Sequence, residues 1–194
     1  VSAKTTTRTG KPMKTKSNPR HIVQLVGTLN AAVWLGGAVF FTFIAGPAFF
    51  DPALEAVLPK PEDGVAARFL IGRFTAFQLS CGCIALVTMT LCWRLQGGKF
   101  PRAQGLLLGG ILLLIVLGMV VLAPKLNALH ELKYADYFDV KATKAQSEAA
   151  GKAFGSLHGL SQVGNLVVLL GLVAQFILLW KEATQRKEKF GFRT

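Results

Sequence analysis

Acidic residues are scarce in this sequence and absent from its long apolar stretches. Only 10 of the 194 residues are Asp or Glu, against 22 Lys or Arg, and charged residues make up 16% of the chain. An average globular chain carries roughly 25%. Four long stretches are apolar on every side, as lipid-facing helices are. These features exclude an ordinary soluble domain. They also leave no carboxylate where a proton-coupled transporter normally needs one.

Cysteine is scarce too, and catalytic motifs are missing. Cys81, Cys83 and Cys92 all fall in one apolar stretch, where a disulfide is not expected. Residues two apart on a helix point about 200° apart, so Cys81 and Cys83 do not suit one copper ion. The chain has no Walker motif, HExxH, GxSxG or paired CxxC. We therefore expect no enzyme and no metal site.

The apolar stretches are each long enough to cross a bilayer, which takes about 20 residues. The first carries no charge from Ile22 to Phe50 and comes after Asn18-Pro19, a helix-start signal. Gly46-Pro47 should bend or end it, and Asp51-Pro52 repeats the start signal. We expect the fourth helix to begin outside the membrane and to enter it near Phe154. The predicted spans are residues 22–50, 66–93, 106–124 and 154–180.

These spans predict an all-α integral membrane protein, a four-transmembrane-helix bundle over residues 19–181. A basic extramembrane tail precedes it at residues 1–18, and a basic C-terminal tail comes after it at residues 182–194. The tails and the loop at residues 94–102 are rich in bases, whereas the two opposite loops hold eight of the ten acids. By the positive-inside rule both termini face the cytoplasm or its equivalent. The membrane would be a bacterial inner membrane or an organellar one.

The net charge of +12 raises the question of nucleic acid. The bases gather in the tails and one short loop, and no folded module with a basic face is left once the spans are removed. We therefore expect a bilayer and other membrane-protein subunits as partners, and no nucleic acid. Anionic lipid headgroups or an acidic protein surface would meet the tails, and we expect the first tail to lie along another protein. Its bases are Lys4, Arg8, Lys11, Lys14, Lys16 and Arg20.

A weak internal echo is present. The first span ends in AGPAFF and the third in LAPKLN, each with Ala and Pro. Two duplicated hairpins would explain this, but proline favours helix ends in any case, and we prefer that simpler interpretation.

Several short motifs resemble the transmembrane protein 205-like family, whose domain has no established function. They are WLGG (with Trp34), AGPAFF (with Pro47), FLIGRFTAF (with Arg73), LAPKLNALH (with Pro124) and FGSLHGLSQVGN (with His158). The resemblance covers about residues 25–180. It implies a four-helix membrane protein and no particular reaction.

Polar residues in the fourth span form the first candidate site. His158, Ser161, Gln162 and Asn165 share one helix face. They could contact a ligand or cofactor, or they could join helices by hydrogen bonds, which we favour. His130 and His158 lie at the same end and could hold a haem or metal, although no spacing supports this. Arg73 could bind a lipid headgroup or a quinone oxygen, but snorkelling or structural pairing is the simpler role.

Small residues four apart indicate close helix packing. We assign this role to Trp34, Gly36, Gly109, Gly159 and Ser161. The function we predict is a non-catalytic accessory or structural subunit that packs within a larger membrane complex. The alternative is a small transporter-like or cofactor-binding bundle that uses His158, Asn165 and Arg73 for haem, quinone or a metal.

Overall fold

The computed structural model describes residues 19–97 and 100–190, and every regular element in these ranges is helical. Four helices are long and apolar enough to cross a membrane, as the sequence predicts. Two of them are interrupted by short π-helices, η1 and η2. The elements are α1 (Pro19–Phe40), η1 (Phe41–Ala45), α2 (Gly46–Ala48), α3 (Pro52–Val57), α4 (Glu62–Gln96), α5 (Arg102–Leu117), η2 (Gly118–Leu122), α6 (Ala123–Lys133) and α7 (Lys144–Phe190).

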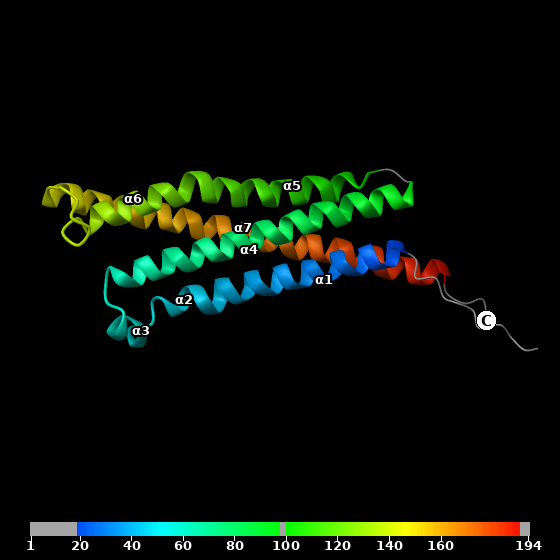
Figure 1. The fold of residues 1–194 in the computed structure, drawn as a ribbon, viewed down its shortest axis with the longest axis horizontal. Coiled ribbons are helices and arrows are strands. Elements are labelled where there is room, and N and C mark those ends of the chain that lie inside the picture. The colour runs from blue at the N-terminus through cyan, green and yellow to red at the C-terminus, as the bar shows by residue number, and fades with distance from the viewer. Residues whose placement is uncertain (1–18, 98–99, 191–194) are drawn as a thin grey trace, which may run out of the picture.

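The helices form an elongated bundle in which α1 packs against α4 and α7, and α5 packs against the same two helices (Figure 1). We call the end where α1 begins and α7 finishes the tail end. α4 ends and α5 begins there as well (Figure 1). The opposite end, with α3 and the connection from α6 to α7, is the loop end. The bundle thus consists of two antiparallel hairpins, α1–α4 and α5–α7.

A π-helix precedes a proline in the first helix of each hairpin. η1 ends two residues before Pro47, and η2 ends two residues before Pro124. In each case the backbone N–H of the residue before the proline donates to the carbonyl oxygen five residues earlier. Gly46 donates to Phe41, and Ala123 donates to Gly118. A proline ring clashes with the carbonyl four residues earlier, and the wider π turn accommodates it. The chain after Pro124 therefore stays helical to Lys133, well beyond the end of the third predicted span.

Helix ends at the loop end depend on local signals. The Asp51 side chain accepts a hydrogen bond from the backbone N–H of Ala53 at 2.8 Å and so caps α3, as the Asp-Pro pair predicts. α7 begins at Lys144, ten residues before the predicted membrane entry at Phe154. This early start lets α7 pack along α6.

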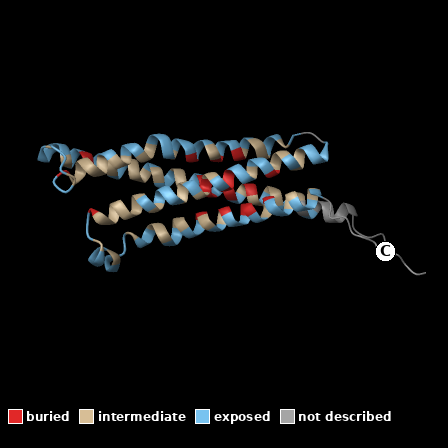
Figure 2. Ribbon diagram, viewed as in Figure 1, coloured by how far each residue is buried: buried red, intermediate tan, exposed pale blue. Residues whose placement is uncertain are grey.

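Most of the buried residues lie midway along the bundle (Figure 2). Trp34 and Leu108 are the largest that are fully enclosed, at 1% and 0% exposure. They belong to a core that also contains Cys81, Ile111 and Leu172. Most other apolar side chains of the long helices face outward, as expected for helices in lipid.

Candidate functional site

An aromatic cluster at the loop end surrounds His130. The imidazole contacts the rings of Tyr134, Phe138 and Phe154, with centroid separations of 5.1, 5.7 and 5.7 Å. The Lys133 ammonium lies 4.7 Å from the Tyr134 ring centroid and 5.6 Å from that of Phe154. Aromatic faces attract such cations, so the cluster binds α6 to the start of α7.

The first hairpin also reaches this cluster. A Cβ on Gly64 would collide with the His130 ring, so only glycine lets α4 approach here. One turn further, Arg68 Nη1 donates to Glu131 Oε1 at 2.9 Å. Both side chains are partly exposed. These contacts join α4 to α6 across the two hairpins.

His158 lies at the edge of the same cluster. It stacks on Phe154 at 5.7 Å and meets Phe50 edge-on at 6.2 Å. Its Nε2 is 3.3 Å from the Gln162 side-chain nitrogen. Each histidine therefore contacts Phe154 rather than the other imidazole. Among the described residues no three His, Cys, Asp or Glu side chains gather as a metal site would require.

The other polar residues of this face have separate partners. Asn165 Nδ2 donates to Thr42 Oγ1 in η1 at 2.8 Å, which joins α7 to the first helix. Ser161 Oγ donates to the carbonyl of His158 at 2.7 Å, a bond within its own helix. On this helix face Asn165 therefore bonds to another helix, Ser161 bonds within its own helix, and His158 makes aromatic contacts.

Arg73 is not part of this group. Its guanidinium lies over the Phe69 ring on the exposed side of α4, 5.1 Å from the centroid. Within the described residues it has no carboxylate partner. The three residues of the alternative cofactor hypothesis contact different side chains: His158 contacts Phe154, Asn165 contacts Thr42 and Arg73 contacts Phe69.

The residues expected to pack helices together have different surroundings. Trp34 is enclosed in the core, but no atom of the described chain lies within 4 Å of a Cβ placed on Gly36, Gly109 or Gly159. Close approaches occur elsewhere: a Cβ on Gly37 would meet Phe77, one on Gly82 would meet Leu112, and one on Gly171 would meet Ile111 at 2.9 Å. Spacing alone cannot say which face of a helix turns inward. The helix-packing role expected for Gly36, Gly109 and Gly159 therefore stays a prediction, and within the described bundle other glycines make the close approaches.

Sequence reasoning missed three buried amides inside the bundle. Asn30, Gln78 and Gln175 are all buried, and Asn30 donates to the Cys81 carbonyl at 2.9 Å. Trp34 Nε1 and Gln175 Oε1 are buried without a hydrogen-bond partner among the described residues. Uncharged amides inside apolar stretches were the available signal, because polar groups in lipid usually face the bundle interior.

Of the two predicted tails, the structure describes only residues 182–190 of the second, which belong to α7. Lys4, Arg8, Lys11, Lys14 and Lys16 lie outside the described residues, and Arg20 lies in the first turn of α1. Outside the spans, Lys60 forms an ion pair with Glu55 at 2.9 Å, and this hydrogen-bonded carboxylate raises the pKa of Lys60. The described residues thus offer aromatic, amide and ion-pair contacts between helices.

Neither curated proteins nor solved structures yield a match to this chain. Residues 29–135, more than half of the chain, match a protein family described as a domain of unknown function. The match covers α1 from Leu29 through α6, and so includes both π-helices and the His130 cluster up to Ala135. It does not supply the narrower transmembrane protein 205-like name. The chain belongs to the family of the domain of unknown function DUF4149.

Proposed function

We propose that this membrane protein is a non-catalytic accessory or structural subunit that packs against other membrane proteins. The observation that carries the proposal is a set of glycines on outward faces. Gly36 on α1 and both Gly109 and Gly110 on α5 are exposed, with open space where a Cβ would be. Glycine inside a helix costs roughly 0.5–1 kcal/mol relative to alanine. Nothing within the described chain offsets that cost at these positions.

A partner helix packed against these exposed glycines would offset the free-energy cost of having glycine inside a helix. Without a hydrophobic driving force in lipid, helices associate through close van der Waals contact, and small residues permit the backbones to approach. Gly37, Gly82 and Gly171 already serve this purpose inside the bundle. Gly36 and Gly109 offer the same kind of surface on the outside.

The test is co-purification after gentle solubilisation. Gly109→Leu adds bulk to the outward face of α5, and partner retention should fall by about tenfold or more, the scale of an interface hot spot. Ala76→Leu adds similar bulk to an exposed position on α4 and is the matched control. Equal retention of partners by both variants would contradict the proposal.

The alternative of a transporter-like or cofactor-binding bundle has less support, because His158, Asn165 and Arg73 have separate surroundings. Absorbance spectra and metal analysis of the purified protein would decide. A stoichiometric haem, pigment or metal would overturn the subunit proposal as stated. The narrower relationship to the transmembrane protein 205-like family rests on short motifs such as WLGG and FGSLHGLSQVGN.

The orientation is likewise a proposal. The base count favours a cytoplasmic or equivalent location for the tail end. Single cysteines at Thr5→Cys and Gln146→Cys, in a background without the native cysteines, should be labelled from opposite sides of the membrane. Labelling of both from one side would overturn the topology.

A further inference from the structure

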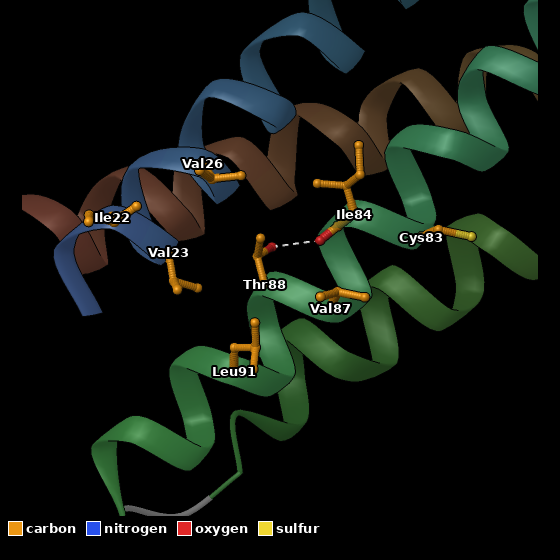
Figure 3. A pocket seen from close by; sticks show the side chains of 8 residues that line it. All are labelled: Ile22, Val23, Val26, Cys83, Ile84, Val87, Thr88 and Leu91. Carbon is orange, nitrogen blue, oxygen red and sulfur yellow. Dashed lines mark hydrogen bonds between the residues drawn. The ribbon is translucent and has the colours of Figure 1, made fainter. Parts of the chain in front are cut away.

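An apolar groove runs along the outer face of the first hairpin, between α1 and α4 near the tail end (Figure 3). Its volume is about 370 Å³. The lining side chains are apolar apart from one hydroxyl and one thiol: Ile22, Val23, Val26, Cys83, Ile84, Val87, Thr88 and Leu91. Both helices are candidate membrane spans, so acyl chains are the solvent at this face.

The chemistry of the lining favours a hydrocarbon occupant. The Thr88 hydroxyl donates to the carbonyls of its own helix, Ile84 at 2.8 Å and Ala85 at 3.1 Å, and so is already satisfied. On α4 the groove extends from Cys83 to Leu91, about 12 Å at 1.5 Å per residue. One leaflet of a bilayer contributes about 15 Å of hydrocarbon, half of the usual thickness. The groove therefore has about the length of one acyl chain.

An arginine lies beyond the groove-lining residues on each of the two helices, toward the tail end. Arg94 lies three and seven residues beyond Leu91 and Val87, so it continues the same face of α4. Arg20 lies three residues before Val23 on α1. The first turn of α1 has no acid, and Arg94 is the base in the last turn of α4. A phosphate at this position would meet positive charge from both helices.

From the groove and its flanking bases we infer a binding site for one anionic phospholipid. One acyl chain lies in the groove, and the phosphate lies between Arg20 and Arg94. The site binds an annular lipid at a defined position. It is independent of the glycine faces of the proposed function.

Native mass spectrometry of the full chain tests the site. The probes are phosphatidylglycerol and phosphatidylcholine with identical acyl chains. The wild type should bind its first phosphatidylglycerol at least about fivefold more tightly than phosphatidylcholine, the effect expected of one base near a charged surface. Arg94→Gln should remove most of this preference. Arg102→Gln, which removes a base from the start of α5 at the tail end of the bundle, should preserve the preference for phosphatidylglycerol.

A second pair of variants tests the groove itself. Val87→Phe fills it and should weaken the binding of both lipids at the first site by severalfold, whereas Leu170→Phe on an exposed face of α7 should leave binding unchanged. Thermal unfolding of each variant shows whether it is folded. Equal affinity for the two lipids in the wild type would overturn the inference. So would an equal loss of lipid affinity in Val87→Phe and Leu170→Phe. An equal loss of the phosphatidylglycerol preference in Arg94→Gln and Arg102→Gln would overturn it as well.

Discussion

The two hairpins begin alike and finish differently. Each opens with a helix in which a five-residue π-helix is succeeded, two residues later, by proline. After Pro47 the helix ends at Ala48, whereas after Pro124 it continues to Lys133. The residues beyond each proline differ: Asp51-Pro52 starts a new helix after the first, while the chain beyond Pro124 contains no proline or glycine before α6 ends at Lys133. A proline in these helices is accommodated by the π turn, and the residues after it decide whether the helix stops.

The shared π-helix also bears on the internal echo. In both AGPAFF and LAPKLN the proline lies two residues after the end of a π-helix. In both, the residue before the proline donates its N–H to the first carbonyl of that π-helix. A simple preference of proline for helix ends does not explain a helix that continues past Pro124. The structure thus gives the duplication hypothesis more support than the sequence motifs did.

The largest expected effect would come from emptying the common core of the two hairpins. Trp34→Ala should lower the free energy of unfolding by about 3–5 kcal/mol and Leu108→Ala by about 2–5 kcal/mol, because each side chain is fully enclosed. Trp34→Phe should cost clearly less than Trp34→Ala, since the indole N–H has no partner to lose among the described residues. Thermal and denaturant unfolding in detergent would measure this. Equal losses for Phe and Ala would contradict it.

Replacing each proline would test the comparison directly. Pro124→Ala removes the ring clash, so we expect η2 to close into an α-helix and to turn α6 by about 100°. Glu131 would then move away from Arg68 and His130 from Phe154, with a total loss of about 1–3 kcal/mol for the ion pair and the aromatic cluster together. Pro47→Ala should be milder, because α2 has only three residues. A short thiol–thiol crosslinker between Arg68→Cys and Glu131→Cys should react in the Pro47→Ala background and fail in the Pro124→Ala background.

Asn165 tests how α7 is joined to the first hairpin. Asn165→Leu should cost about 0.6–2 kcal/mol, the scale of hydrogen bonds between membrane helices, because its donor to Thr42 is lost. Thr42→Val should cost a similar amount, and the double variant no more than either alone. Gln175→Leu is the control on the same helix. Its Oε1 has no hydrogen-bond partner in the described chain, so this change should be close to neutral.

The smallest effect should come from the ion pair between the hairpins. Glu131→Gln should cost at most about 1 kcal/mol, since both side chains of the Arg68–Glu131 pair are partly exposed. The difference from wild type should shrink as salt rises. A loss that is larger and independent of salt would mean that Glu131 has a further role in the cluster.

The number of spans could be predicted from composition because lipid requires long apolar helices whose backbone groups are satisfied internally. The interhelical role favoured for Asn165 agrees with its bond to Thr42. The glycines could not be placed, since Gly36 and Gly37 are adjacent and only packing selects Gly37 for the inside. The His130 cluster was equally hidden, because it depends on α6 continuing past Pro124 and on the absence of a side chain at Gly64, where the His130 ring packs.

The length of α7 has a mechanical consequence. Its 47 residues form one unbroken helix, about 70 Å at 1.5 Å per residue, against a hydrocarbon layer of about 30 Å. The helix therefore works as a strut that projects beyond the lipid. α6 contacts α7 near Phe154. A tilt of α7 at that contact would therefore displace the C-terminal end of α7 at the tail end of the bundle. If α7 tilts as a straight rod, a displacement at one membrane surface would be carried to its end at the other surface.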